Sequence, residues 1–245
     1  GSRAATRVGL MQAQRLAGEL AMAGLAITSG LASGIDGAAH EGALAVGGIT
    51  LAVLGCGPDR VYPPRHDGLM QRIRAEGGLL VSELAPGTLP CAWHFPRRNR
   101  VISALSLGVL VVEAGPDSGS IITARAACDM SRDVWAVPGP VQSLQSRGCH
   151  QLIRQGQAML VETAADVLTD VMPRLRQWYG QPAGPCRNGS DRVRPPRAEP
   201  GAAALALRDG MDWQVQAIDD LVAAGLGTPG AILAALGELE LLGWV

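Results

Sequence analysis

The sequence predicts an α/β fold in which helices cover both faces of a doubly wound, mostly parallel sheet. Short apolar runs alternate with segments of helical periodicity, and the turns that follow several of these runs are rich in Gly and Ser. The chain of 245 residues has 32 glycines and a hydrophobic fraction of 47%, which allows a sizeable core of Ala, Leu and Val. This length fits one large domain and one small domain.

Apolar runs predict five buried parallel strands, at Leu25–Thr28, Ile49–Leu54, Leu79–Val81, Gly108–Glu113 and Asp133–Val137. Helical periodicity predicts helices near residues 8–23, 35–46, 67–77, 97–107 and 120–130. A further helix at Cys149–Gln155, a last strand at Ala158–Val161 and a closing helix at Ala164–Tyr179 follow. Residues 1–179 are therefore expected to form a Rossmann-like domain.

The segment Gly1-Ser2-Arg3 is typical of the turn that follows a strand. Without that strand the sheet would contain an unpaired neighbour or an apolar gap, so we expect the intact protein to begin earlier. The alternative is that Gly1 and Ser2 were left by a cloning vector.

Residues 180–202 combine many Gly, Pro and Arg with no apolar periodicity, which predicts a flexible linker. Residues 203–245 return to helical patterning, with one helix at Trp213–Ala224. A second helix starts at the N-cap Thr228, with Pro229 in its first position, and is apolar over Ile232–Leu242. This predicts a small helical, winged-helix-like domain that is truncated before its wing. Residues 213–245 are acidic and contain no Arg, which favours a protein-contact or regulatory role over duplex DNA binding.

The net charge of −1 excludes a generally basic, polyanion-binding protein. All 21 basic residues are arginine, whose planar guanidinium suits phosphate and carboxylate groups. Nucleic acid would therefore need a local arginine patch. The five cysteines are odd in number, widely spaced and without a CxxC pair, which argues against a disulfide framework or a structural metal site. With no signal peptide or membrane segment visible, a cytoplasmic protein is expected.

Three loops at the carboxyl ends of strands have the composition of phosphate-binding loops. Ligands of doubly wound sheets bind at this edge, where backbone N–H groups and helix N-termini attract anions. The candidate residues are Gly1, Ser2, Arg3 and Thr6; Ser29, Gly30, Ser33 and Gly34; and Ser118, Gly119 and Ser120. One such loop is weak evidence because many Gly/Ser loops only turn the chain, but three in one sheet predict a phosphate site.

Common nucleotide-binding motifs are missing from these loops. A Walker A loop requires a lysine, and the chain has none. No GxGxxG followed by an acidic ribose ligand is present either. An ordinary NTPase or dehydrogenase is thereby disfavoured, and no cofactor is expected.

A fourth element, Trp93–Arg100, places three arginines and an asparagine directly after the only phenylalanine of the chain. Guanidinium groups bind phosphates, and an aromatic ring can stack on an unpaired base. The candidates for single-stranded nucleic acid are Phe95, Arg97, Arg98, Asn99 and Arg100. The alternative is a solvated helix start with Phe95 in the core.

Catalytic groups are sparse. Asp36 and His40 are four residues apart on one predicted helix face and could form an acid/base pair. The structural alternative, with Asp36 capping the helix and His40 buried, is favoured. Glu83 and Glu113 lie near strand ends, and Cys56 follows a strand where a packed thiol is expected. No GxSxG or HExxH motif occurs, so no catalytic or metal residue is assigned.

Together these motifs resemble the DNA-processing protein A family, also called Smf. The landmarks occur in family order over about 1–160: Gly1-Ser2-Arg3 with Thr6 and Gly9, Ser29–Asp36 with Ala39-His40, Tyr62-Pro63, Ser82-Glu83, Phe95–Arg100, Glu113 with Ser118–Ser120, and Val137–Gly139. The C-terminal piece resembles the family's small winged-helix-like domain. The resemblance implies a homodimer that binds and protects single-stranded DNA and loads the RecA recombinase during natural transformation, without catalytic turnover.

The resemblance also implies roles for individual residues. The DNA backbone would contact Arg3, Ser29, Gly30, Ser118, Gly119 and Ser120, and Phe95, Arg98 and Arg100 would lie along the same groove. Family members carry a lysine just before the Phe segment, where this chain has Ala92 and Trp93, and Arg97 is a candidate replacement. The Gly148-Cys149-His150 loop departs from the family pattern.

Two other function classes remain open. The first is an enzyme of the Rossmann-like phosphoribohydrolase type that acts on nucleotides, although its Pro-Gly-Gly-x-Gly-Thr loop is replaced here by Asp117–Ser120. The second is a scaffold that acts through its dimer and its C-terminal helices.

Overall fold

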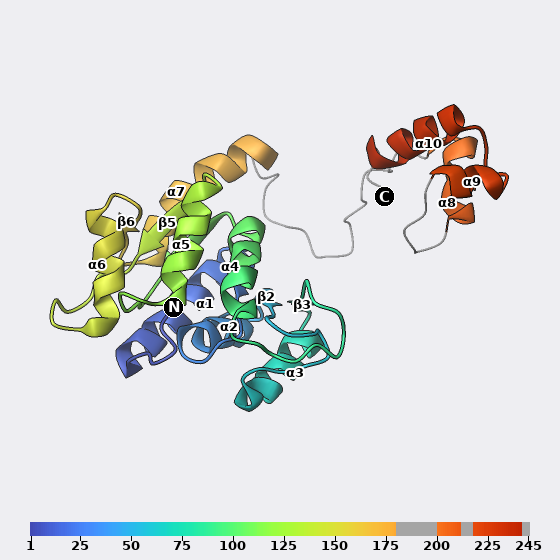
Figure 1. Cartoon of the computed structure of the whole chain (residues 1–245). Helices are drawn as coiled ribbons and strands as arrows, with labels where there is room; N and C mark the ends of the chain where they lie inside the picture. Colours follow the sequence, from blue (N-terminus) through green and yellow to red (C-terminus); the bar gives the residue numbers. More distant parts are fainter. Residues whose placement is uncertain (180–199, 212–217, 242–245) are drawn as a thin grey trace. The chain divides into compact units, whose positions relative to one another are not determined.

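The computed structural model describes residues 1–179, 200–211 and 218–241. The chain divides into two compact units, Gly1–Pro182 and Ala183–Val245 (Figure 1). Of the predicted linker, residues 180–199 lie outside the described residues.

The first unit alternates strands and helices as the apolar periodicity predicted. Its strands are β1 (Ile27–Ser29), β2 (Thr50–Val53), β3 (Leu79–Val81), β4 (Gly108–Val111), β5 (Asp133–Ala136) and β6 (Met159–Leu160). Its α-helices are α1 (Arg7–Met22), α2 (Ile35–Ala45), α3 (Asp67–Ala75), α4 (His94–Leu105), α5 (Gly119–Asp129), α6 (Arg147–Arg154) and α7 (Ala164–Tyr179), with short 3₁₀ helices η1 (Pro64–His66) and η2 (Leu144–Ser146).

The strands form two parallel sheets of three strands each, rather than the single sheet predicted. Their orders are β1-β2-β3 and β4-β5-β6, and no ladder joins β1 to β4 in the described part of the chain. Ile27 pairs with Thr50 and Leu51 with Leu79, whereas Gly108 pairs with Asp133. The carboxyl ends of β1 and β4 both border one cavity, so the loops that follow them meet.

Helices cover both faces of these sheets, because successive residues of β5 pack against helices on opposite faces. Val134 and Ala136 pack with residues of α5 and α6, whereas Trp135 packs with residues of α1 and α7 on the opposite face. Around β2, residues of α2 and α3 form a separate cluster with Ala52 and Leu54. Figure 1 shows α4 and α5 side by side.

Helix α4 begins at His94, three residues before the predicted start at residue 97. The predicted start at residue 97 left Pro96 outside the helix. In the structure Pro96 lies in the first turn of α4. A backbone N–H at this position has no acceptor within the helix, so proline costs no hydrogen bond there. As a result, Phe95 belongs to the helix and is fixed by it.

The second unit contains α8 (Ala202–Gly210), α9 (Ile218–Ala223) and α10 (Pro229–Leu241). Ala204, Leu207, Leu221, Ile232 and Leu239 form its core. Helix α10 begins as predicted, and the amide of Ala231 donates to the Thr228 hydroxyl. Residues 212–217 of the predicted helix Trp213–Ala224 lie outside the described residues, as do residues 242–245. The described part of this unit is helical and does not show the predicted winged-helix form. No helix of the described residues is long and apolar enough to cross a membrane.

Candidate functional site

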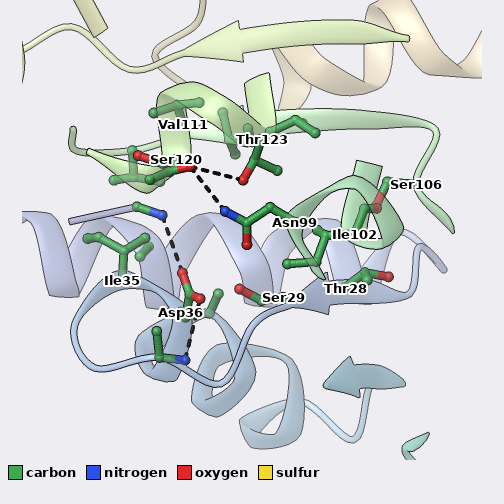
Figure 2. Close-up of a pocket in the computed structure, with 18 of the residues that line it drawn as sticks. Thr28, Ser29, Ile35, Asp36, Asn99, Ile102, Ser106, Val111, Ser120 and Thr123 are labelled. Carbon is green, nitrogen blue, oxygen red and sulfur yellow. Dashed lines mark hydrogen bonds and ion pairs between the residues drawn. The ribbon is translucent and has the colours of Figure 1, made fainter. Parts of the chain in front are cut away.

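The carboxyl ends of β1 and β4 open into a cavity of about 1080 Å³, called here the main groove. Figure 2 shows Thr28 and Ser29 of β1 on one side and Val111 of β4 on the other, with Asn99 of α4 between them. Ten of the predicted site residues line this groove: Gly1, Ser2, Arg3, Ser29, Phe95, Arg98, Asn99, Ser118, Gly119 and Ser120. Six predicted residues do not line it: Thr6, Gly30, Ser33, Gly34, Arg97 and Arg100.

Glu113, at the end of β4, holds the first loop in place. Its buried carboxylate accepts hydrogen bonds from the Thr6 hydroxyl at 2.6 Å and from the Thr6 amide at 2.9 Å. The Thr6 hydroxyl in turn caps α1 by accepting from the Gly9 amide at 3.0 Å. A Cβ atom on Gly9 would lie 2.2 Å from the carboxyl carbon of Glu113, so only glycine fits there. Thr6 therefore holds the first loop in place without lining the groove itself.

Asp36, in the first turn of α2, organises the second loop. Its carboxylate accepts from the amides of Gly30 and Ala32 and from the nitrogen of Gly1 (Figure 2). Burial opposes ionisation of this carboxyl group, but the positive charges of the Gly1 nitrogen and Arg98 favour it. The net effect is a pKa of Asp36 below its ordinary value. A charged Asp36 thus binds three segments of the chain together.

Ser2 joins the loops that follow β1 and β4. Its amide donates to the carbonyl of Glu113 at 2.7 Å, and its carbonyl accepts from the amide of Ile35 at 3.2 Å. Gly34 has φ of +84°, and a Cβ atom there would lie 2.2 Å from the Ser2 carbonyl oxygen. The predicted Gly30-x-x-x-Gly34 loop is therefore needed for contact between two loops of the protein.

The third loop forms the N-terminus of α5. Ser118 is its N-cap residue, and the Ser118 and Ser120 hydroxyls lie 2.7 Å apart. The side-chain amide of Asn99 donates to the carbonyl of Gly119 at 3.1 Å and fixes this loop to α4 (Figure 2). The first amides of a helix lack intrahelical acceptors, and the helix dipole adds partial positive charge at this end. This edge of the groove is therefore suited to an anion.

Aromatic and cationic groups also meet in the main groove. The guanidinium carbon of the exposed Arg3 lies 5.2 Å from the centre of the Phe95 ring. The centre of the Tyr62 ring also lies 5.2 Å from the centre of the Phe95 ring. Tyr62 was absent from the predicted site residues, although the Tyr62-Pro63 pair is one of the landmarks that carry the family resemblance. The signal that could have found it is an aromatic residue in a loop at the carboxyl edge of the sheet.

Arg98 has an internal role. It is only 6% exposed, and its guanidinium donates to the carbonyls of Gly30, at 2.9 Å, and Val53, and to the side chain of Asn99. Burial lowers the pKa of Arg98, and Asp36 partly opposes this effect. Arg98 contributes positive charge behind the groove wall while its donors hold β1, β2 and α4 together.

Arg97 and Arg100 lie beside a second, smaller cavity of about 190 Å³. Arg100 forms an ion pair of 2.6 Å with Glu83, and the Arg97 guanidinium lies 5.9 Å from the ring centre of the exposed Trp93. Arg97 and Arg100, three residues apart, lie on the same side of α4, whereas Arg98 is turned about 100° from Arg97 and also lines the main groove.

The possible acid/base pair of Asp36 and His40 is not assembled. Thr50 donates its hydroxyl hydrogen to the Ile27 carbonyl, so Nδ1 of His40, 2.7 Å from that hydroxyl, is the donor. Burial lowers the pKa of His40 to about 4, against the opposing effect of Asp36, so the imidazole is neutral near pH 7. His40 is fully buried, but the structural alternative is only partly right: the N-cap residue of α2 is Gly34 and not Asp36, and Nε2 of His40 has no hydrogen-bond partner among the described residues.

The described residues contain no site suited to thiol or metal chemistry. Cys56 is packed and donates to the Arg60 carbonyl, and burial raises the pKa of its thiol. Burial also raises the pKa of Cys149 to about 11. The four cysteines of the described segments are unpaired, and no group of three potential metal ligands occurs there.

Comparison with known proteins identifies the family to which this arrangement belongs. Residues 1–172 match the family model described as DNA recombination-mediator protein A. The chain belongs to this family. It is 42% identical over 246 residues to Protein Smf of Escherichia coli, covering all of this chain and 64% of that protein. It is also 40% identical over 251 residues to a putative DNA processing protein DprA of Mycobacterium tuberculosis, covering 99% of this chain and 60% of that protein.

Solved structures of family members share the fold of the first unit. The DNA processing protein A of Streptococcus pneumoniae gives a TM-score of 0.65 at 44% identity over 70% of this chain and 59% of that one. A Helicobacter pylori family member, described for its single-stranded DNA binding mode, gives 0.64 at 31% identity over 71% of this chain and 78% of that one. A molybdenum cofactor binding protein of Rippkaea orientalis, at 17% identity and a TM-score of 0.50 over 70% of this chain and 91% of that one, shares only the fold. The chain spans about three fifths of the length of the curated relatives named above.

Proposed function

We propose that the first unit binds single-stranded DNA along the main groove and acts as a recombination mediator without catalytic turnover. The observation that carries this proposal is the presence of two features in one groove. Arg3 lies over the Phe95 ring, and the first turn of α5 lines the same groove. A strand needs both features, because its phosphates bind cations and helix N-termini while its bases stack on aromatic rings.

In this proposal the residues predicted for the site have different roles. Arg3, Ser118, Gly119 and Ser120 contact phosphates, and Phe95 stacks on a base. Ser29 lines the groove, whereas Thr6, Gly30 and Gly34 shape the loops from inside. Arg97 and Arg100 add positive potential beside the start of α4, and Arg98 adds it from behind. An unpaired strand is favoured over a duplex because stacking on Phe95 requires an accessible base.

The decisive experiment is a fluorescence anisotropy titration with oligo-dT and with a duplex of equal length at several salt concentrations. We expect preference for oligo-dT, with a log–log salt slope of about −0.7 per phosphate neutralised. Arg3→Ala should make the slope shallower by about 0.7. Arg154→Ala is the matched control, because Arg154 is an exposed arginine at the C-terminal end of α6. Equal affinity for both DNA forms contradicts the proposal, as does a slope that Arg3→Ala leaves unchanged.

We further propose that the protein protects incoming DNA and passes it to RecA during natural transformation, as a homodimer in the cytoplasm. Family membership supports these roles. Light scattering during size-exclusion chromatography tests the dimer, with a monomeric mass as the contradicting result. Deleting residues 203–245 tests the second unit. RecA loading should be lost while affinity for oligo-dT is retained, and loss of both would contradict a separate protein-contact role.

The phosphoribohydrolase alternative has no comparable support from the site. The oxygens of Asp36 accept backbone donors and His40 is fully buried, so neither group can reach a nucleotide in the groove. Incubation with nucleoside monophosphates should release no free base. Release of base by the purified protein, lost on Asp36→Asn, would revive the enzymatic function.

A further inference from the structure

The second cavity, of about 190 Å³ beside the start of α4, has no ligand in the proposed function. Leu54 and Leu84, which follow β2 and β3, supply its apolar lining. Trp93, His94 and Arg97 line it from the start of α4. The cavity is smaller than the pockets of about 300–1,000 Å³ that hold drug-sized ligands. It is therefore suited to a small group, such as one nucleobase, rather than to a whole cofactor.

Trp93 presents an open aromatic surface beside the second cavity. It is 58% exposed, although tryptophan is on average a highly buried residue. The Arg97 guanidinium carbon lies 5.9 Å from the centre of its ring, and the His94 ring meets it edge-on, with centres 4.2 Å apart. These contacts orient the indole and leave much of it open to solvent. Binding of unpaired bases without sequence preference requires such a ring.

The charges around the second cavity leave one cation available to a phosphate. Arg100 and Glu83 neutralise each other in an ion pair of 2.6 Å, and Arg98 gives its donors to backbone carbonyls. Arg97 is exposed and forms no ion pair with the described residues. A guanidinium is well suited to bind a phosphate group. Arg97 can therefore bind the phosphate of a nucleotide whose base lies against Trp93.

His94 gives an independent indication that the second cavity takes a ligand. It lines this cavity and not the main groove, and it is only 9% exposed. Its Nδ1 atom is buried and has no hydrogen-bond partner among the described residues. Such atoms are rare in native structures, because a buried polar atom without a partner is costly. A ligand in the second cavity would supply the missing partner.

The second cavity is continuous with the main groove through Arg98, which lines both. Phe95 lines the main groove, and Trp93, two residues earlier, lines the second cavity. The two aromatic rings therefore lie on either side of one buried cation. A strand with one base on Phe95 can pass the start of α4 and place another base on Trp93.

We infer that the second cavity binds one further nucleotide of the same single strand. Its base stacks on Trp93 and hydrogen-bonds to Nδ1 of His94, and its phosphate binds Arg97. This inference rests on the proposed function, because it extends the strand held in the main groove. A short oligonucleotide then occupies the main groove alone, whereas a longer one occupies both sites.

The test measures anisotropy of the full chain with oligo-dT of increasing length. Trp93→Ala should weaken binding of the longer oligonucleotides about 5- to 150-fold, through loss of one stacked base, and leave the shortest that binds unaffected. Trp93→Phe should retain most of the affinity. Leu89→Ala is the matched control and should change nothing. Leu89 is an exposed apolar residue between β3 and α4 that lines neither cavity.

Phe95→Ala separates this inference from the proposed function, because it should weaken binding at every length. If it does so while Trp93→Ala changes affinity at no length, the inference is overturned and the proposed function stands. If neither variant changes affinity at any length, both are contradicted. An equal loss at all lengths with Trp93→Ala also overturns the inference, as does a change of mass in light scattering, which would place Trp93 in a protein interface.

His94→Phe tests the buried polar atom, since it keeps an aromatic ring but removes Nδ1. Affinity for the longer oligonucleotides should fall about 2- to 12-fold, the range for one hydrogen bond. The urea midpoint of the free protein should not fall, because Nδ1 has no partner there among the described residues. A lower midpoint with unchanged affinity would show a purely structural His94 and overturn the inferred hydrogen bond.

Discussion

Gly9→Ala should unfold the first unit more easily, although alanine is the better helix former. The added Cβ atom would lie 2.2 Å from the carboxyl carbon of Glu113 and 2.5 Å from both carboxylate oxygens. The carboxylate must therefore move away and give up its bonds to the amide and hydroxyl of Thr6. Because the bond lost at Thr6 also positions the first loop, affinity for oligo-dT should fall as well.

The size of this effect follows from the bonds lost. Hydrogen bonds to a charged group contribute about 1.5–3 kcal/mol each, so two of them amount to at least about 3 kcal/mol. Replacing glycine by alanine inside a helix returns about 1 kcal/mol. The free energy of unfolding should therefore fall by about 2 kcal/mol or more. A shifted carboxylate that keeps one of the two bonds would reduce the fall to about 0.5–2 kcal/mol.

Gly68→Ala is the matched control because Gly68 lies in α3 and no atom is within 4 Å of its added Cβ. It should raise the free energy of unfolding by up to about 1 kcal/mol and leave DNA affinity unchanged. Urea unfolding followed by fluorescence of the buried Trp135 measures both variants. A Gly9→Ala protein as stable as the parent would refute the reasoning, because the clash and the lost bonds cannot then be real.

Three further changes address the groove and its support. As the pH falls from 6.5 to 4, His40 becomes protonated in the unfolded chain but stays neutral in the folded protein. The free energy of unfolding should therefore decrease by about 3 kcal/mol over this range, at 1.36 kcal/mol per pKa unit. His40→Gln should remove this fall in urea titrations at pH 7 and 4.5, and an unchanged pH dependence argues against a low pKa. Phe95→Ala should weaken oligo-dT binding about 5- to 150-fold through loss of stacking, whereas Phe95→Tyr should retain it; equal affinities would place no base on this ring. Asn99→Ala removes the bond to the Gly119 carbonyl and should weaken oligo-dT binding without changing the salt slope, since no cation is lost. A changed slope would mean that losing the bond from Arg98 to Asn99 also displaces the Arg98 charge.

The order of strands and helices in the first unit was predictable because buried parallel strands are short apolar runs and their helices have a different period. The approximate site was predictable for the same reason, since parallel strands bring their carboxyl ends to one edge. Ser118 and Gly119 were placed beside the groove in this way, because their loop follows a strand that the apolar pattern already marks.

The individual arginines of α4 were not separable by sequence. Arg97, Arg98 and Arg100 look equivalent in a basic cluster, yet Arg98 is buried against the carbonyls of Gly30 and Val53. Those carbonyls are 68 and 45 residues away along the chain, and no local pattern reports such contacts.

The glycines that first indicated phosphate binding turn out to serve the packing of the protein against itself. Because glycine has no side chain, Gly9 leaves space for the Glu113 carboxylate and Gly34 leaves space for the Ser2 carbonyl. Gly30 in the same way leaves space for the side chains of Arg98 and Asp36. A Cβ atom at any of the three would lie within 3 Å of those groups. We therefore expect the capacity of the main groove to attract a DNA backbone to belong to a smaller set, the exposed Arg3 and the first turn of α5. Since these two lie on different loops, their spacing depends on the contacts of Ser2 and Asn99. Variants that loosen either contact should weaken DNA binding even though neither residue needs to touch a phosphate.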